Sequence, residues 1–564
     1  MKKIAYFLLS LLSLLSLSLF VACGQSKEVT NTLFKNDITK TISSGEVKGK
    51  KDSTTATIEW LGIPYAAEPV GELRWKAPQP IEKWEGSFDA TEIGSPFIQI
   101  SKGEVVGSEG ALNLDVVRPD NTESNLPVIV FLHGGNNQTG HAQEIKGSGF
   151  VNDINAVYVS VNYRLGALGF NPLEALKTGT DEENSGNYTL LDIAAALDWV
   201  EENIEVFGGD KDNVTLAGFS AGGRDVMATL ISPLFKDKYD KAISFSGGMT
   251  LADETDSQDI FATAIAPLVV EDGIKSTELE AKEWLLSNDR QVADYLYGLP
   301  AESLASLMGN AGIRMSVFPH LYKDGVVIPK EGFDTSNYND VPLLLITGTS
   351  EFSLFTAFDP YFANSVTDGS LFSDADKLKE FIFTESYGSA LYRLSNTVDS
   401  ARKLQGTYKS PIYIGEISYG DNTETAPKTA QLLGAFHGVF EPLLQQPSNY
   451  ATFIGEDFNS EGAKQLSQQF KAYLKGFITS SNPEGEKLPQ WEEWTADGSQ
   501  VMKFDASLEK AEIELGEDSQ TAEDIVANLR ADSTLSADKK QVLIDNVLNG
   551  RWFSQPLDGL KVNE

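Results

Sequence analysis

Short, continuously apolar runs alternate with helical periods through the middle of this 564-residue chain, and this alternation is the strongest constraint on its fold. Such runs are typical of buried parallel strands, and the intervening periods supply helices that cover them. The sequence therefore predicts an α/β fold, with a mostly parallel central sheet and helices on both faces. The predicted strands are 128–132, 157–161, 214–217, 241–245, 343–347 and 411–415.

The clearest helical periods lie at residues 193–204 and 466–477, where apolar residues recur every three or four positions. The stretch from about 250 to 340 is mostly helical and interrupts the alternation of strands. We expect this insertion to cap the carboxyl edge of the sheet and to shape a pocket. Residues 506–564 are acidic with helical periods, so we expect appended C-terminal helices there.

Composition excludes several classes of function. Hydrophobic residues make up 41% of the chain, enough for a large folded core. The 81 acidic and 45 basic residues give a net charge of -36, which repels nucleic acid, so we expect no nucleic-acid partner. The single cysteine excludes an intramolecular disulfide, and the four histidines lack metal-ligand spacing. We therefore expect neither a metal nor a cofactor.

The N-terminus carries a targeting signal. Met1-Lys2-Lys3 precedes an apolar run that ends at Ala22, immediately before Cys23. An uncleaved membrane anchor is one interpretation. The run also resembles a bacterial lipoprotein signal peptide over 1–22, which implies a diacylglycerol (palmitate-type) anchor on Cys23 and a polar tether over 23–36. Both interpretations place the globular part on the extracytoplasmic face of a bacterial cell membrane.

A serine lies between a predicted strand and a predicted helix, in the sequence Gly218-Phe219-Ser220-Ala221-Gly222. A sharp strand-to-helix turn exposes the serine hydroxyl, and small neighbours allow the chain and the helix to approach closely. A serine at neutral pH needs a general base, which in this geometry is almost always histidine.

The base is chosen by elimination among His133, His141, His320 and His437. The first two belong to a glycine-containing loop with a different role, and the third follows Phe-Pro with no matching context. His437 is flanked by glycines and lies late in the chain, so we predict that it is the base.

Hydrolysis of an acyl bond also needs backbone N–H groups aimed at the developing oxyanion. The loop after strand 128–132 reads His133-Gly134-Gly135-Asn136, and it supplies such donors. Together with the N–H of Ala221 at a helix N-terminus, Gly135 and Asn136 form the predicted oxyanion hole. The alternative is that the two glycines only make a turn.

Residues 37–505 resemble the type-B carboxylesterases, the cholinesterase-like and para-nitrobenzyl esterase-like branch of the α/β-hydrolase fold. The matching stretches, in chain order, are 61–66, 71–75, 108–109, 161–170, 186–188, 207–210 and 482–483. The resemblance implies a triad of Ser220, Glu351 and His437, with Ser246 supporting the glutamate. It further implies a buried structural ion pair between Glu109 and Arg164.

Two residues depart from the pattern of this family. Phe219 replaces the usual glutamate before the nucleophile, and Asn136 replaces a third glycine. Asparagine tolerates unusual backbone angles, so the oxyanion hole can survive the change. Just after the serine turn, Arg224 and Asp225 are placed where they could touch substrate, but we expect them to form a pair on the helix surface.

The sequence thus predicts an extracytoplasmic serine carboxylesterase that acts on small-molecule esters without a cofactor. One alternative is a cholinesterase-like surface protein that only binds. Another is a lipase or an amidase that uses the same triad. The sequence does not specify acyl length, alcohol group or oligomeric state.

Overall fold

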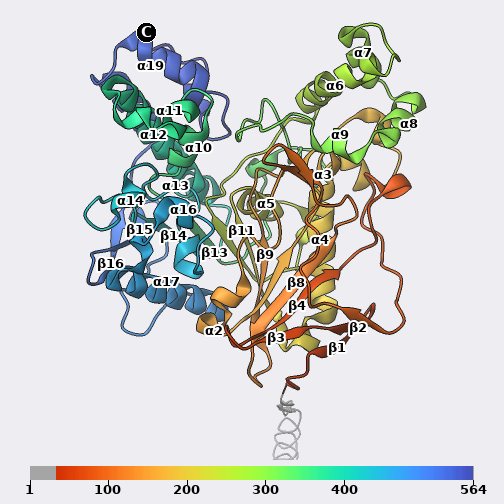
Figure 1. The fold of residues 1–564 in the computed structure, drawn as a ribbon, viewed down its shortest axis with the longest axis horizontal. Coiled ribbons are helices and arrows are strands. Elements are labelled where there is room, and N and C mark those ends of the chain that lie inside the picture. Colours follow the sequence, from red (N-terminus) through yellow and green to blue (C-terminus); the bar gives the residue numbers. More distant parts are fainter. Residues whose placement is uncertain (1–33, 563–564) are drawn as a thin grey trace, which may run out of the picture.

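The computed structural model describes residues 34–562, which are built around one large sheet (Figure 1). The 11 strands of this sheet lie in the order β16-β15-β14-β13-β12-β11-β9-β10-β8-β4-β3. All pairings from β10 to β15 are parallel, and those at the two ends of the sheet are antiparallel. The predicted α/β fold with a mostly parallel sheet is confirmed.

The predicted strands all fall on strands of this sheet. Its strands are β3 (Lys50–Asp52), β4 (Thr57–Pro64), β8 (Asn113–Pro119), β9 (Leu126–Leu132), β10 (Val157–Val161), β11 (Gly209–Phe219), β12 (Lys241–Phe245), β13 (Leu343–Gly348), β14 (Ile412–Ile417), β15 (Gln500–Ala506) and β16 (Ala511–Glu517). Two small sheets contain β1 (Thr39–Ile42), β2 (Gly45–Lys48) and β5 (Ser87–Asp89), and β6 (Gln99–Ser101) and β7 (Glu104–Val106).

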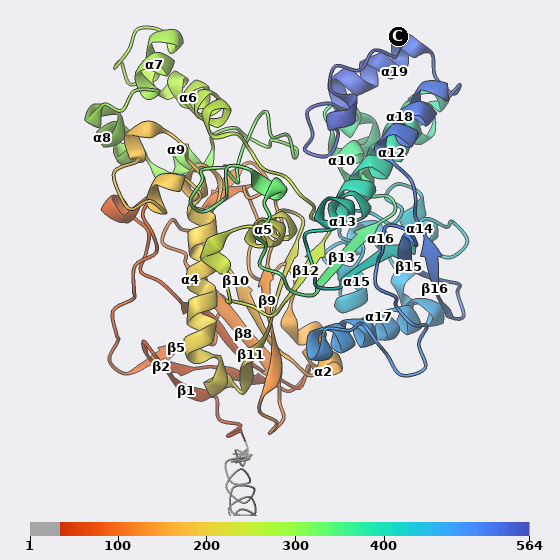
Figure 2. The ribbon, with the colours of Figure 1, turned by 180° about the vertical axis from the view of Figure 1, so that it is seen from behind.

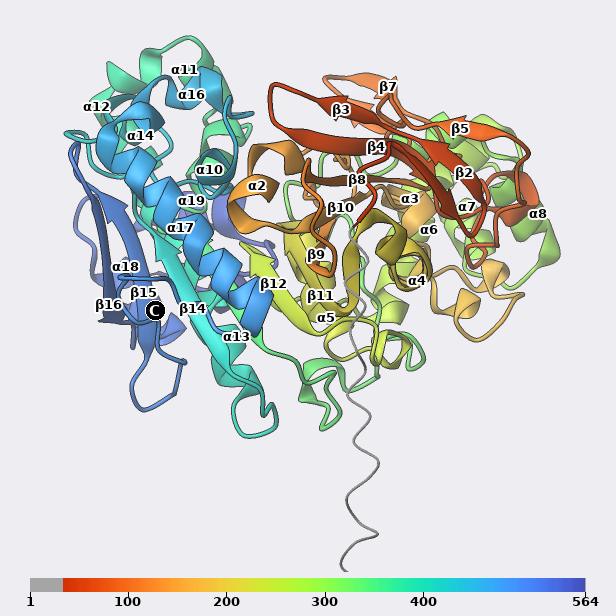
Figure 3. The ribbon, with the colours of Figure 1, turned by 90° about the horizontal axis from the view of Figure 1, so that it is seen from below.

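Helices cover both faces of the large sheet, because its central strands are apolar on both sides. Along β9, Val128 and Val130 pack into one core, whereas Ile129 and Phe131 pack into the other. The first core lies under α4 (Tyr188–Asn203) and α5 (Ala221–Thr229), seen in front of the sheet in Figure 2. The second lies under α2 (Val151–Ile154) and α17 (Glu461–Ser480), which crosses the sheet in Figure 3.

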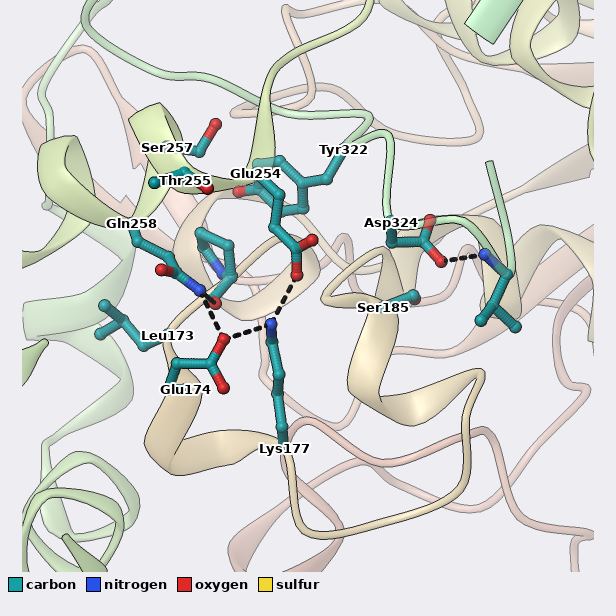
Figure 4. Close-up of polar contacts among 12 residues, drawn as sticks. Leu173, Glu174, Lys177, Ser185, Glu254, Thr255, Ser257, Gln258, Tyr322 and Asp324 are labelled. Carbon is teal, nitrogen blue, oxygen red and sulfur yellow. Dashed lines mark hydrogen bonds and ion pairs between the residues drawn. The ribbon is translucent and has the colours of Figure 1, made fainter. Parts of the chain in front are cut away.

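The helical insertion lies above the carboxyl end of β9, as expected. It contains α6 (Glu254–Glu271), α7 (Glu278–Leu285), α8 (Arg290–Gly298) and α9 (Ala301–Ala305). Lys177, in the loop before α4, bonds to Glu174 at 2.7 Å and to Glu254 at 2.5 Å, which fastens the start of α6 to the main body (Figure 4). At its other end, Gly309 accepts a hydrogen bond from Gln138 in the loop after β9.

The remaining helices cluster beside β13 to β16. They are α10 (Ser353–Phe358), α11 (Ala363–Thr367), α12 (Ala375–Asn396), α13 (Val398–Leu404), α14 (Pro427–Ala430), α15 (Glu441–Leu444), α16 (Ala451–Ile454), α18 (Ala522–Ala531) and α19 (Ala537–Leu543), with the short α3 (Gly166–Gly169) on the opposite side. No helix within residues 34–562 is long and apolar enough to cross a membrane.

The C-terminal region differs from the prediction of helices alone. Residues 511–517 form β16, which pairs antiparallel with β15 at the edge of the sheet. In this strand Ile513 and Leu515 alternate with glutamates, a period of two that favours a half-buried strand. The expected helices follow as α18 and α19, and both lie near α12 in Figures 1 and 2.

The predicted signal peptide, Cys23 and most of the tether lie outside the described residues. The first described residue, Phe34, already belongs to the folded body, because its side chain is only 8% exposed. The guanidinium of Arg118 lies 3.8 Å from the centre of its ring. Phe34, which lies inside the range predicted for a tether, is thus packed on the folded body.

Candidate active site

Ser220 occupies a strained turn between β11 and α5. Its backbone angles are φ 56 and ψ -114, a combination that is uncommon for any residue other than glycine. Its N–H donates to the carbonyl of Phe245 at 2.9 Å, which holds the turn against β12. The side chain is 6% exposed. The predicted strand, turn and helix are therefore all present.

Close packing explains the two glycines of this turn. A Cβ on Gly218 would lie 2.3 Å from the carbonyl oxygen of Gly222. A Cβ on Gly222 would lie 2.2 Å from the carbonyl oxygen of Leu132, at the end of β9. Only glycine allows α5 to begin this close to both strands.

The structure brings Glu351 and His437 together from two different loops. His437 Nδ1 lies 2.5 Å from Glu351 Oε2. The other carboxylate oxygen of Glu351 accepts hydrogen bonds from Ser246 Oγ at 2.5 Å, Thr347 Oγ1 at 2.9 Å and Gly348 N at 2.7 Å. The fully buried carboxylate is thus fixed on one side and orients the imidazole on the other.

Aromatic rings hold the imidazole of His437. Its ring centre lies 4.8 Å from that of Phe219, 5.1 Å from that of Phe355 and 5.3 Å from that of Tyr392, which is stacked on it. His437 Nε2 is buried and has no hydrogen-bond partner among residues 34–562. No hydrogen bond joins it to Ser220 in this state, and such contacts often tighten only when substrate binds.

The predicted oxyanion loop presents free backbone donors. Gly135 and Asn136 have φ angles of 102 and 57, so asparagine does adopt the left-handed conformation required of it. Within the described chain, no acceptor takes the N–H of Gly135, Asn136 or Ala221. Gly134 lies against the nucleophile, since a Cβ placed on it would be 3.2 Å from Ser220 Cβ.

The other histidines have separate surroundings. His133 stacks on Tyr163 at 4.3 Å, and burial lowers its pKa to about 3. His320 is fully buried, and burial lowers its pKa well below the usual value. His141 is mostly exposed and accepts a hydrogen bond from the backbone of Gln143. None of the three contacts Glu351.

The predicted ion pair between Glu109 and Arg164 is wrong. Arg164 pairs with Asp192 at 2.6 Å, and Glu109 pairs with Arg74 at 2.6 Å. The resemblance to the family implied this pairing, but in the structure Arg164 and Glu109 each lie beside a different side chain of opposite charge.

The predicted surface pair of Arg224 and Asp225, just after the turn at Ser220, is also wrong. Arg224 and Asp225 are both buried, and no ion pair joins them in the described structure. Asp225 instead accepts a hydrogen bond from Asn137 at 2.8 Å. The short helix α5 lies deep in the molecule, so neither of its faces is free.

Sequence reasoning missed two parts of the site. Glu144 lies partly buried beside the oxyanion loop, and its Oε2 accepts the N–H of Gly134 at 2.6 Å. Near the C-terminus, Phe553 stacks on Tyr392 at 4.3 Å, and Trp552 meets the same ring edge-on at 5.4 Å. In the sequence, the one feature that pointed to this contact is the pair of adjacent aromatic residues Trp552 and Phe553 in a largely polar C-terminal segment.

Comparison with known proteins identifies the family. The family model described as "Carboxylesterase family" matches residues 36–387, more than half of the chain. The chain belongs to the carboxylesterase family. It is 28% identical over 488 residues to para-nitrobenzyl esterase of Bacillus subtilis (strain 168), covering 83% of this chain and 95% of that protein. Carboxylesterase 3 of Homo sapiens is 30% identical over 505 residues, covering 79% and 84% of the two chains.

A solved structure supports the same assignment. A PNB esterase superposes with a TM-score of 0.67 at 27% identity, covering 87% of this chain and all of that one. The carboxylesterase therefore has the α/β-hydrolase fold and is a carboxylic ester hydrolase, and the predicted resemblance to type-B carboxylesterases is confirmed. The described part of the chain contains no cluster of three His, Cys, Asp or Glu residues placed to hold a metal.

Replacing Ser246 tests how much the site depends on the fixed glutamate. Ser246→Ala removes one of three hydrogen bonds to Glu351 Oε1, and we expect kcat to fall about 10-fold with little change in KM. The matched control is Ser244→Ala, since Ser244 lies on β12 two residues before Ser246 and its hydroxyl donates to the carbonyl of Gly223 instead. Steady-state hydrolysis of a p-nitrophenyl ester measures both. An equal effect of the two variants would contradict a positioning role.

The partly buried Glu144 predicts a pH dependence of stability. Burial raises its pKa from 4.5 to about 7, so the folded protein holds a proton that the unfolded chain releases within this range. Stability from this group is therefore lost as pH rises from about 4.5 to 7. Glu144→Gln keeps an oxygen for Gly134 without the charge, and should raise the urea midpoint above wild type at about pH 8 but not at about pH 4. Exposed Glu72→Gln is the control. The same shift at both pH values would contradict the assignment.

Proposed function

We propose that this carboxylesterase hydrolyses small-molecule esters through a triad of Ser220, His437 and Glu351. The family accounts for ester hydrolysis, and the triad is the finer assignment that the local geometry supports. Support comes chiefly from His437, whose Nδ1 is bonded to a buried glutamate while its Nε2 has no partner among residues 34–562. A histidine held in this way is ready to accept a proton.

In the first half of the reaction, Ser220 Oγ attacks the ester carbonyl carbon and His437 Nε2 takes the hydroxyl proton. Glu351 keeps the other proton of the imidazole on Nδ1 and stabilises the imidazolium that forms. The carbonyl oxygen becomes an oxyanion that faces the N–H groups of Gly135, Asn136 and Ala221. Each such donor lowers the barrier by about 3 kcal/mol.

Collapse of the tetrahedral intermediate breaks the bond to the alcohol, which leaves with the proton from His437. The acyl group then remains on Ser220 as an ester. In the second half, water loses a proton to His437 and attacks the acyl carbon. The bond to Ser220 Oγ then breaks, Ser220 takes the proton back from His437, and the carboxylic acid leaves. Every step is an acid–base or addition step, so no cofactor is required.

We also propose that the enzyme is anchored by lipid on Cys23, on the extracytoplasmic face of a bacterial cell membrane. The support is the sequence alone, in which two lysines, an apolar run and small residues precede the single cysteine. Two or more acyl chains attached to one cysteine are sufficient for stable membrane anchoring.

The nucleophile is tested by covalent labelling. A fluorophosphonate probe should label wild-type protein at one serine, and Ser220→Ala should abolish labelling and lower ester hydrolysis more than about 1,000-fold. Ser232→Ala is the matched control, because that hydroxyl is also buried but lies after α5. Unlabelled wild-type protein would favour the alternative of a surface protein that only binds. Full activity in Ser220→Ala would place the nucleophile elsewhere.

The anchor is tested in a bacterial host supplied with a clickable palmitate analogue. Full-length protein should incorporate the analogue and sediment with membranes, because the thiol of Cys23 is the attachment point. Cys23→Ser should lose the label. Label retained in Cys23→Ser would contradict lipidation at this residue, and membrane association without label in wild type would favour the uncleaved anchor.

A further inference from the structure

One buried arginine beside the nucleophile has a nitrogen with no partner. Arg224 lies on α5 one turn after Ser220, and its backbone N–H donates to the Ser220 carbonyl at 2.9 Å. The side chain is 2% exposed. Its Nη2 donates to Asn136 Oδ1 at 2.9 Å, whereas Nη1 is buried without a hydrogen-bond acceptor in the described chain.

Other buried arginines of the described chain are fully engaged. Arg164 binds Asp192 at 2.6 Å, and Arg551 binds Asp359 at 2.8 Å. Arg118 donates to several backbone carbonyls, including that of Phe207 at 2.8 Å. A buried donor without an acceptor is costly, because it has lost its hydrogen bonds to water. In the part of the chain that the structure describes, Arg118 also lacks a carboxylate partner, but each of its nitrogens donates to an oxygen; Arg224 differs in its unpartnered Nη1, which calls for a ligand.

The neighbouring carboxyl does not meet this need. Asp225 accepts a hydrogen bond from Asn137 at 2.8 Å, and burial raises its pKa to about 7, although the nearby charge of Arg224 acts in the opposite direction. Among residues 34–562 no carboxylate oxygen lies within ion-pair distance of the guanidinium, so Asp225 supplies no acceptor for Nη1. The guanidinium is held in place by Asn136, and its Nη1 remains without an acceptor among these residues.

The guanidinium belongs to the wall of the active site. Asn136, its hydrogen-bond partner, lies in the oxyanion loop and is partly exposed. The ring of Trp552 lies 5.9 Å from the guanidinium and 5.4 Å from the ring of Tyr392. Tyr392 in turn stacks on His437. The guanidinium is thus bonded to the oxyanion loop and lies beside Trp552, which packs on the aromatic wall of the general base.

We propose that Arg224 binds a carboxylate of the substrate, so that the preferred esters carry an acidic group in their acyl or alcohol part. The proposal rests on the proposed function of Ser220 and His437. A carboxylate oxygen would accept the hydrogen bond of Nη1, and the charge-assisted bond would neutralise the guanidinium. The net charge of -36 repels anions at long range, so selectivity for them requires a local cation of this kind.

Matched ester pairs test the proposal. Mono-4-nitrophenyl glutarate is compared with 4-nitrophenyl butyrate for an acid in the acyl part, and 4-acetoxybenzoate with its methyl ester for an acid in the alcohol part. We expect wild type to prefer the acidic member of at least one pair. Arg224→Gln should lower kcat/KM for that member, mainly through KM, about 10- to 100-fold more than it lowers kcat/KM for the neutral member.

Two further variants separate charge from structure. Arg224→Lys keeps the charge and should retain part of the preference. Arg290→Gln is the matched control, because Arg290 is 90% exposed on α8 and far from this wall. If Arg224 only positions Asn136, Arg224→Gln will lower kcat equally for both members of a pair, and the proposal is wrong.

Wild-type protein provides a test that does not depend on folding of a variant. Glutarate should inhibit hydrolysis of the acidic ester competitively, and neutral glutaramide should not; equal inhibition by both would overturn the proposal. If wild type hydrolyses neutral esters, but replacing Arg224 does not change its preference between acidic and neutral esters, this inference is overturned and the proposed function stands. Wild type that hydrolyses neither member and resists the fluorophosphonate would overturn the proposed function as well.

Discussion

Close contact between α5 and two strands is the constraint on which the site depends. The turn at Ser220 has an unfavourable backbone conformation, and it persists because packing and the hydrogen bond to Phe245 leave no alternative. Glycine at 218 and 222 removes the side-chain atoms that would separate the helix from the sheet. The same contact brings the oxyanion loop at the end of β9 against the serine. The energetic cost of the backbone conformation of Ser220 is thus offset by the packing of α5 against the sheet.

Much of this arrangement was predictable because it is local. The strands that precede Ser220, Glu351 and His437 each show as short apolar runs, and parallel strands bring their carboxyl ends to one edge. Asn136 was expected to accept a left-handed conformation, and its φ of 57 agrees. The family resemblance supplied Glu351 and Ser246, which composition and spacing could not.

What the sequence did not reveal depends on contacts between distant segments. Arg164 pairs with Asp192, and Glu109 pairs with Arg74, because a buried ion pair forms between the charged side chains that the fold places closest together. Phe219 replaces a family glutamate, yet a carboxyl still reaches this region from Glu144, which bonds to Gly134. The acidic and helical character of the surrounding residues predicts helix at 511–517, where the chain forms a short alternating strand.

The aromatic wall around His437 is completed by the last part of the polypeptide. Phe553 stacks on Tyr392, which stacks on the imidazole, and Trp552 closes the same cluster from the edge. Translation proceeds from the N-terminus, so a nascent chain makes its serine, glutamate and histidine long before these two rings leave the ribosome. The packing around His437 is therefore completed only after Trp552 and Phe553, which follow all three of these residues in the chain, have been synthesised.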